Sequence, residues 1–200
     1  MSATARGAAI SRGDLPARRS HILDAAQACF TRAGFHRTTM QDIAREAAMS
    51  PANIYRYFAS KEAVVTGLAE REGARAAALV AALERHGDPA GTVLGLINAY
   101  FVEISRETAA FRLELWSEMH RNPALADLAR THEDGFRDWF VAALAPAGGG
   151  EAATLYETVS ALLKGIVVNR AVRPGYDPGP AASAIRARIE AVLTGGPIRD

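Results

Sequence analysis

The sequence predicts an all-helical protein, and three observations support this fold class. Alanine is abundant, and apolar residues recur at spacings of three and four from residue 16 onward, as in helices that bury one face. No segment alternates polar and apolar residues with the period of two that a half-buried strand requires. Prolines and glycines gather between the periodic segments, where they end helices. We therefore expect about nine helices.

The composition favours a folded protein with a packed core. Hydrophobic residues make up 49% and charged residues 22% of the 200 residues. The single cysteine, Cys29, cannot form a disulfide within the chain. We find neither an apolar run long enough to span a bilayer nor a signal-peptide pattern. The sequence therefore predicts a cytosolic protein that does not enter the membrane.

Positive charge is concentrated in the first part of the chain. The net charge of the whole sequence is only +1, but residues 1–60 contain eight arginines against four acidic residues. This asymmetry is typical of a protein whose basic part faces nucleic acid. Residues 1–15 are small, polar and dotted with arginine, without an apolar period, and we expect them to form a flexible basic arm.

The first two predicted helices span about residues 17–33 and the segment after Thr39. Gly34 follows the first helix as a C-terminal cap, because glycine readily adopts the left-handed backbone conformation that such caps use. Thr39 precedes Asp42 by three residues, which resembles a capping box. In that motif each of the two residues bonds to the backbone of the other, so Thr39 should mark a helix start.

A third, very short helix is predicted to begin after Ser50. Serine is a favourable N-cap, and Pro51 suits the first helical position. The helix should continue to Phe58. Ile54 and Phe58 lie four residues apart, so both should point toward the core.

Six further helices are expected, the first of them directly after Ser60. Proline and glycine segments separate them. Their predicted ranges are 61–86, 90–107, 109–121, 124–145, 151–172 and 178–194.

The second and third helices fit a helix-turn-helix unit at about residues 39–58. They are joined by a turn at residues 48–50, and the third helix opens with small side chains that let its backbone approach base edges in the major groove. Asparagine can pair with adenine and arginine with guanine through two hydrogen bonds each. The residues expected to face the bases are Pro51, Ala52, Asn53, Tyr55 and Arg56.

A second group of residues is expected to hold the phosphate backbone. Helix N-termini, hydroxyl groups and cations fix a protein on the duplex without reading its sequence. The residues expected to contact phosphate are Thr39, Ser50, Tyr57 and Lys61.

Short motifs across residues 18–68 carry a resemblance to a known family. These motifs are Ile22-Leu23-Asp24-Ala25-Ala26, Phe30, Gly34-Phe35, Thr38-Thr39, Asp42-Ile43-Ala44, Ala47, Ser50, Ile54-Tyr55, Tyr57-Phe58 and Lys61-Glu62. With them, this segment resembles the DNA-binding domain of TetR-family regulators. One departure is Ala48-Met49, where the family often has a glycine. Ala48 can serve there if its backbone keeps ordinary helical or extended angles.

The resemblance implies a domain organisation and a mode of action. It implies a DNA-binding domain at residues 16–76, and a ligand-binding and dimerisation domain at residues 77–200. It also implies a homodimer that binds a palindromic operator and is released by a small molecule. Residues 111–116 followed by Asn122-Pro123 look like one subgroup of such C-terminal domains. In that subgroup the last two helices, here 151–172 and 178–194, form the dimer interface.

The ligand pocket is predicted only from helix facing and the resemblance. Aromatic residues at helical spacing fill an ordinary core as readily as they line a pocket, so both interpretations remain open. The pocket candidates are Tyr100, Phe101, Ile104, Trp116, Met119, His120, Trp139 and Phe140.

Alternatives to a ligand-released repressor remain open at this point. An activator, or a ligand-independent DNA-binding protein of the same fold, would show the same residues. An all-helical enzyme is disfavoured, because the sequence has no nucleophile–base pair or cofactor fingerprint. Neither a cofactor nor a metal site is expected.

Overall fold

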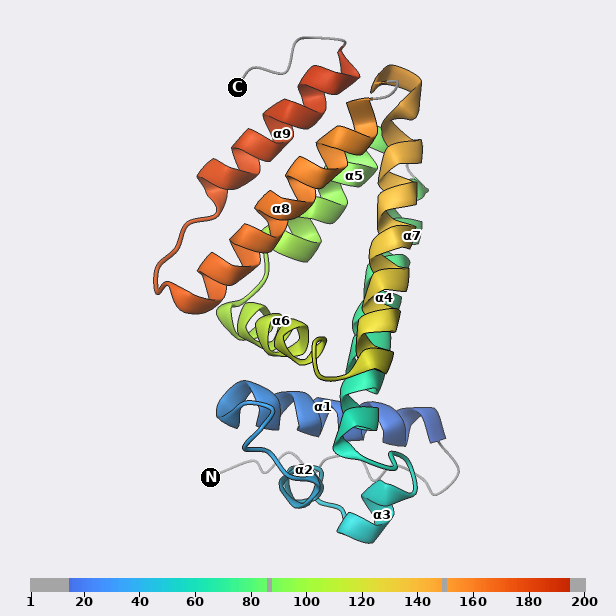
Figure 1. Cartoon of the computed structure of the whole chain (residues 1–200), viewed down its shortest axis with the longest axis vertical. Coiled ribbons are helices and arrows are strands. Elements are labelled where there is room, and N and C mark those ends of the chain that lie inside the picture. Colours follow the sequence, from blue (N-terminus) through green and yellow to red (C-terminus); the bar gives the residue numbers. More distant parts are fainter. Residues whose placement is uncertain (1–14, 86–87, 149–150, 195–200) are drawn as a thin grey trace, which may run out of the picture. The chain divides into compact units, whose positions relative to one another are not determined.

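The computed structural model describes residues 15–85, 88–148 and 151–194. Helices form all the regular structure in these ranges, which confirms the predicted fold class (Figure 1). The chain divides into two compact units between Val64 and Val65, inside one long helix. The sequence placed this boundary after residue 76, in the same helix. Residues 1–14 of the predicted arm lie outside the described residues.

The N-terminal unit is a three-helix arrangement followed by the start of a long fourth helix. α1 packs against α2, and α2 packs against α3. Gly34 caps α1 with a positive φ of 79°, and its N–H donates to the Phe30 carbonyl at 2.8 Å, as the sequence predicted. The elements are α1 (Leu15–Ala33), α2 (Met40–Glu46), α3 (Pro51–Tyr55) and α4 (Lys61–Glu84).

α3 ends earlier than the sequence predicted. It stops at Tyr55, whereas the apolar pattern extended the helix to Phe58. The N–H groups of Arg56 and Tyr57 bond carbonyls only three residues back, at 3.3 and 2.9 Å, so the chain tightens into a turn. Phe58 still reaches the core and is 2% exposed, beside Ile54 at 0%. The predicted inward facing of these two residues is confirmed.

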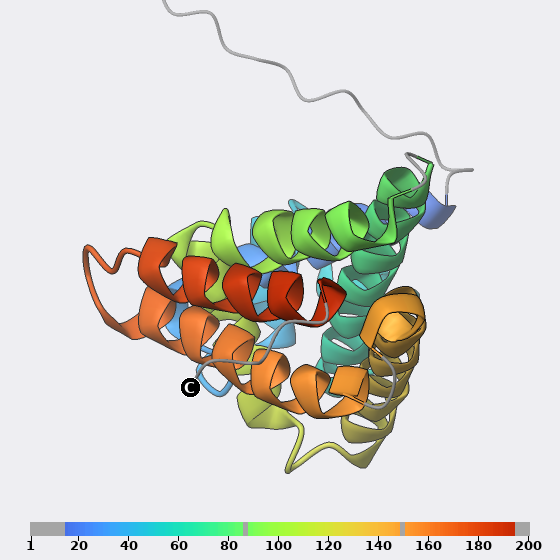
Figure 2. The same ribbon diagram turned by 90° about the horizontal axis from the view of Figure 1, so that it is seen from above.

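The C-terminal unit is a helical bundle built around α8. α8 packs against α6, α7 and α9, and both views show α8 and α9 running side by side (Figures 1 and 2). A large apolar cluster holds α5, α7, α8 and α9 together. The elements are α5 (Pro89–Ile97), the π-helical segment η1 (Asn98–Val102), α6 (Arg106–Glu118), α7 (Pro123–Gly148), α8 (Glu151–Val172) and α9 (Gly179–Leu193).

The helix predicted at residues 90–107 is interrupted by the π-helical segment Asn98–Val102. The N–H of Glu103 reaches back five residues to the Asn98 carbonyl at 2.8 Å, which is the π pattern. Carbonyl oxygens of this segment accept hydrogen bonds from the guanidinium groups of Arg112 and Arg170. These side chains come from other helices, so local periodicity could not predict the interruption.

None of the helices in the described ranges is both long and apolar enough to cross a bilayer. The cytosolic location itself stays a prediction. The described side chains also include no group of three histidine, cysteine or acidic residues placed to hold a metal ion.

Candidate nucleic-acid interface

α2 begins with the predicted capping box. The N–H of Asp42 donates to Thr39 Oγ1 at 3.2 Å, and the N–H of Thr39 donates to Asp42 Oδ2 at 3.0 Å. The Thr39 hydroxyl also donates to Asp42, at 2.7 Å. Hydrogen bonds from this hydroxyl and from the Thr39 backbone lower the pKa of the Asp42 carboxyl. The one O–H donor of Thr39 is therefore already used within the motif.

The turn between α2 and α3 is a Schellman motif with alanine in the glycine position. Met49 N–H donates to the Ala44 carbonyl at 2.9 Å, and Ala48 N–H donates to the Arg45 carbonyl at 3.1 Å. Ala48 has a φ of 52°, in the left-handed region. The condition that Ala48 keeps ordinary angles is thus not met, because the two capping bonds impose left-handed geometry there. The motif forms nonetheless.

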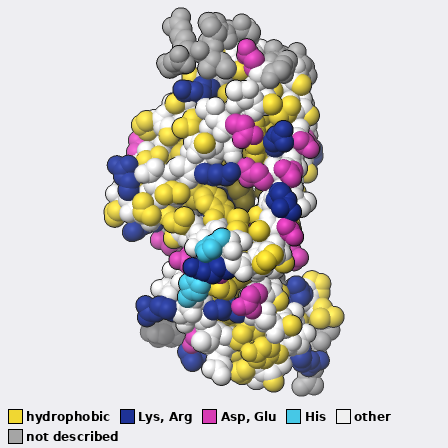
Figure 3. Space-filling view, viewed as in Figure 1, with side chains coloured by type: hydrophobic (Ala, Val, Ile, Leu, Met, Phe, Trp, Pro, Cys, Tyr) yellow, Lys and Arg dark blue, Asp and Glu magenta, His cyan; other side chains and the backbone are white. Residues whose placement is uncertain are grey.

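α3 presents the residues that the sequence assigned to the bases. Ser50 caps the helix by accepting a hydrogen bond from Asn53 N–H at 3.3 Å. Tyr55 is 53% exposed, and Asn53 is half-buried. Hydrophobic side chains lie at the surface over α3, with Lys and Arg side chains beside them (Figure 3). The other exposed candidates are Pro51, Ala52 and Arg56.

The ammonium group of Lys61 already forms hydrogen bonds within the N-terminal unit. Its Nζ donates to the carbonyl oxygens of Phe35 and Thr38 at 2.9 and 3.0 Å, and it lies 4.2 Å from the centre of the Phe35 ring. An ammonium group has three donors, so one remains for a phosphate. Lys61 thus fastens the loop between α1 and α2 to the start of α4. A phosphate contact by Lys61 stays a prediction.

Two side chains of α1 position the helix-turn-helix, and the sequence interpretation did not identify them. Arg19 donates to the Tyr57 carbonyl at 2.9 Å and lies 4.3 Å from the centre of the Phe58 ring. The His21 ring bonds the Ala47 carbonyl at 2.9 Å. Arg19 therefore holds the end of α3, and His21 holds the end of α2. The partners are 38 and 26 residues away, so no local pattern marked them.

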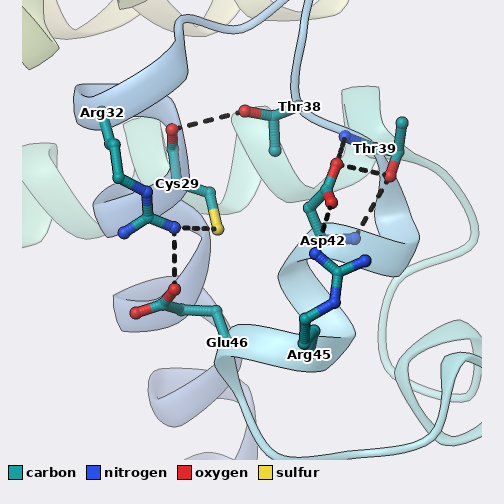
Figure 4. A network of polar contacts seen from close by, with 7 residues as sticks. All are labelled: Cys29, Arg32, Thr38, Thr39, Asp42, Arg45 and Glu46. Carbon is teal, nitrogen blue, oxygen red and sulfur yellow. Dashed lines mark hydrogen bonds and ion pairs between the residues drawn. The ribbon is translucent and has the colours of Figure 1, made fainter.

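A cavity of about 400 Å³ lies between α1 and α2, close to the polar network in Figure 4. Arg32 donates to Glu46 at 2.8 Å and to the sulfur of Cys29 at 3.6 Å. Arg45 bonds Asp42 at 3.0 Å, so the two cations of this network are paired with its two carboxylates. Burial raises the pKa of the Cys29 thiol, which keeps it neutral. This network ties α2 to α1 and needs no ligand for its charges.

Five of the eight predicted pocket residues are divided between two apolar clusters. Ile104 belongs to a small cluster with Trp116 packed against it, whereas Phe140 lies in the large cluster with Trp139. Phe101 packs against both clusters. Of the eight residues, Ile104 alone lines the cavity between α1 and α2 or a smaller one, of about 240 Å³, where α6 begins and α8 ends. Neither of these two cavities therefore gathers the eight residues, and their role in ligand binding stays a prediction.

Two family models match the chain over the two parts defined above. Residues 22–68 match the model of bacterial regulatory proteins of the tetR family, and residues 88–195 match that of tetracyclin repressor-like C-terminal domains. This defines the class: a helix-turn-helix transcriptional regulator, not an enzyme. The chain belongs to the TetR family.

Individual relatives agree with this assignment. The chain is 29% identical to the HTH-type transcriptional regulator UidR of Escherichia coli strain K12 over 117 residues, which cover 56% of this chain and 57% of UidR. The match thus spans little more than half of that relative.

Solved structures show the same fold. A regulator from Rhodococcus sp. RHA1 has a TM-score of 0.78 at 20% identity, covering 88% of this chain and 96% of that one. A regulator from Saccharomonospora viridis in complex with choline has a TM-score of 0.75 at 24% identity, covering 86% and 95%.

Proposed function

We propose that this protein is a transcriptional repressor that binds a palindromic operator through α3 and is released by a small-molecule ligand. The presentation of α3 carries the proposal. Ile54 anchors the helix at 0% exposure while Tyr55 beside it is 53% exposed, and Ser50 fixes the helix start. A short, rigidly anchored helix with small exposed side chains at its N-terminus suits entry into the major groove.

We assign base reading to α3 and the turn after it. Arg56 and Asn53 are the residues able to form two hydrogen bonds with one base, to guanine and adenine respectively. Pro51, Ala52 and Tyr55 would contribute shape and apolar contact. Ser50, Tyr57 and Lys61 would contact phosphates and set the position of the protein on the duplex. Thr39 would join them by exchanging its hydroxyl bond to Asp42 for one to a phosphate.

The experiment selects preferred DNA sequences from a random pool and measures affinity for the selected operator. Arg56→Ala and Asn53→Ala should each relax preference at one position per half-site, at a cost of about 1–3 kcal/mol. Arg130→Ala is the control, because Arg130 is also exposed, with 68% of its side chain accessible, but lies on α7. An unchanged preferred sequence in both α3 variants would contradict the assignment.

Phosphate contacts are separable from base contacts by their salt dependence. Tyr57→Phe should weaken binding to all sequences by the same factor. Lys61→Ala should do so and also reduce the salt slope by about one, since one cation is removed. Affinities unaffected by both changes would rule out the phosphate assignment.

Repression and ligand release are tested together by transcription from a promoter that contains the selected operator. The regulator should lower transcription, and an activator would raise it. Choline is a reasonable first probe, because a regulator of the same fold was solved in complex with it. A ligand that binds only the folded protein raises the melting temperature and should lower operator affinity.

We further propose a homodimer through α8 and α9. α8 carries exposed apolar side chains at spacings that share one side of a helix: Leu162 at 36%, Val168 at 37% and Val172 at 55% exposure. Gly165 lies between them, with open space where a side chain would project. An exposed apolar stripe of this kind marks an interaction surface, and a two-fold dimer would match a palindromic operator.

A further inference from the structure

A second cavity, of about 240 Å³, lies in the C-terminal unit. It is formed where α6 begins, α8 ends and the chain turns toward α9. Lys and Arg side chains gather at the edge of the unit where Figure 1 places that turn (Figure 3). Three arginines line the cavity: Arg106 from α6, Arg170 from the last turn of α8, and Arg173 directly after α8.

The three guanidinium groups have no carboxylate partner in the described part of the chain. Arg106 donates through Nε to the Ala171 carbonyl at 3.2 Å. Arg173 donates through Nη1 to the side-chain oxygen of Asn169 at 3.3 Å. These are neutral acceptors, and a guanidinium has five N–H donors. Most donors of Arg106 and Arg173 are therefore unused.

Arg170 is held more firmly than the other two arginines. It donates to the carbonyl oxygens of Tyr176 and Val102 at 3.3 and 3.0 Å, which fixes the plane of its guanidinium group. Its Nε is buried and has no hydrogen-bond partner. A buried donor without a partner is unfavourable by about 1–3 kcal/mol, so Arg170 keeps one N–H group that the fold does not satisfy.

The acidic side chains near this cavity already accept hydrogen bonds from neighbouring groups. The carboxylate of Glu107 accepts hydrogen bonds from its own N–H and from Ser105 at the start of α6, and these bonds lower its pKa. Asp177 accepts a hydrogen bond from Gly179 N–H at 2.9 Å. Neither residue lines the cavity. An anion in the cavity would therefore meet the three arginines and the start of α6, and no carboxylate among the lining residues.

We propose that this cavity binds the oxyanion of a small metabolite, a carboxylate or a phosphate group, between Arg106 and Arg173. Guanidinium groups bind both kinds of oxyanion through paired, charge-assisted hydrogen bonds. The volume of about 240 Å³ limits the ligand to a small molecule. Such a ligand would link the start of α6 to the end of α8. An effect on operator affinity rests on the proposed regulatory function, but binding itself does not.

Calorimetry on the full chain tests the proposal, with inorganic phosphate and succinate as probes at constant ionic strength. At least one probe should bind saturably, and comparing them distinguishes a phosphate from a carboxylate ligand. Arg106→Gln and Arg173→Gln should each weaken binding about tenfold or more, as expected for loss of a charged hydrogen bond. Arg186→Gln, on an exposed arginine of α9, should bind like the wild type.

Three outcomes would overturn the proposal. The first is the absence of saturable binding by either probe. The second is equal weakening by Arg186→Gln, which would indicate general attraction of anions. The third is a fall in oligomer mass in Arg106→Gln or Arg173→Gln without a loss of probe binding, which would assign the arginines to a partner subunit. Operator affinity is measured separately. The calorimetric results therefore test anion binding even if the protein proves not to be a ligand-released repressor.

Discussion

Ala48 is a residue whose backbone conformation conflicts with its side chain. Its φ of 52° is the one positive value at a non-glycine position in the described residues. A side chain in the left-handed region costs roughly 1–2 kcal/mol because Cβ crowds the backbone. The capping bonds of Ala48 and Met49 hold this geometry, and they end α2 at the point where the chain must reverse into α3.

Replacing Ala48 with glycine should stabilise the protein by about 0.5–1 kcal/mol. The gain is the relieved strain, reduced by the greater freedom of glycine in the unfolded chain. Urea denaturation measures the free energy of unfolding. Ala77→Gly, at an exposed position in the middle of α4, is the control and should destabilise by about 1 kcal/mol. Equal destabilisation by both changes would show that Ala48 is not strained.

For single residues, the sequence predicted the features that depend only on neighbours in the same helix. The exposure of Tyr55 and the burial of Ile54 follow from helical facing alone. The commitment of Lys61 to two carbonyl oxygens, and the contact of Arg19 with the end of α3, join residues more than 20 positions apart. Side chains of this length reach many partners, so sequence spacing cannot select one of them.

The start of α2 depends on a reciprocal pair, Thr39 and Asp42. Thr39→Ala should cost about 0.5–2 kcal/mol of stability through the loss of the cap, whereas Thr39→Ser should cost little because it keeps the hydroxyl. Urea denaturation at pH 7 measures the difference. A Thr39→Ser variant as unstable as Thr39→Ala would show that the methyl group, and not the cap, matters.

The contribution of Asp42 should depend on pH. Its pKa is lowered in the folded state, so the stabilisation is present above the unfolded pKa of about 3.9 and is lost as the pH falls through the folded value. The stability difference between wild type and Asp42→Ala should therefore be constant near neutral pH and shrink in acid. Denaturation curves at several pH values would reveal this, and a difference that grows in acid would contradict it.

α4 and α6 are joined by a buried ion pair. Arg112 bonds Glu72 at 3.2 Å, and the two residues are 6% and 7% exposed. Arg112→Met should destabilise the protein by up to about 3–5 kcal/mol, because the buried Glu72 carboxylate then keeps only the exposed Arg75 as an ion-pair partner. Adding Glu72→Leu should recover most of that loss. Urea denaturation measures both.

The matched control is Arg130→Met, since Arg130 and Asp127 form an ion pair with both side chains 68% exposed. Its cost should be under about 1 kcal/mol. Similar costs for the buried and the exposed pair would contradict the prediction.

Helix starts were more predictable than helix ends. Ser50 and Thr39 cap their helices through neighbours three residues away, so the motif is visible in the sequence. The end of α3 and the π-helical segment depend on hydrogen bonds from Arg19, Arg112 and Arg170, which come from distant helices.

At the scale of the whole molecule, the proposed dimer predicts that a charge in its interface would separate the subunits. Val168→Glu places a carboxylate in the exposed apolar stripe of α8, and burial in an interface would leave that charge unpaired. Sedimentation should show a dimer for the wild type and a monomer for Val168→Glu at micromolar concentration, with operator affinity lost. Ala153→Glu, exposed on another side of α8, should remain dimeric. A Val168→Glu variant that remains dimeric would show that the dimer interface does not include this part of α8.

The π-helical segment between α5 and α6 acts as an insertion that is absorbed within a helix. The bond from Glu103 to Asn98 encloses one residue more than an α-helical bond would. Each residue turns an α-helix by roughly 100°, so deleting one here would rotate the exit of the segment by that angle. The carbonyl oxygens that face Arg112 and Arg170 would then point elsewhere. The number of residues in this connection is therefore fixed by the direction in which these carbonyl oxygens must point, and not by the distance that the chain must span between α5 and α6.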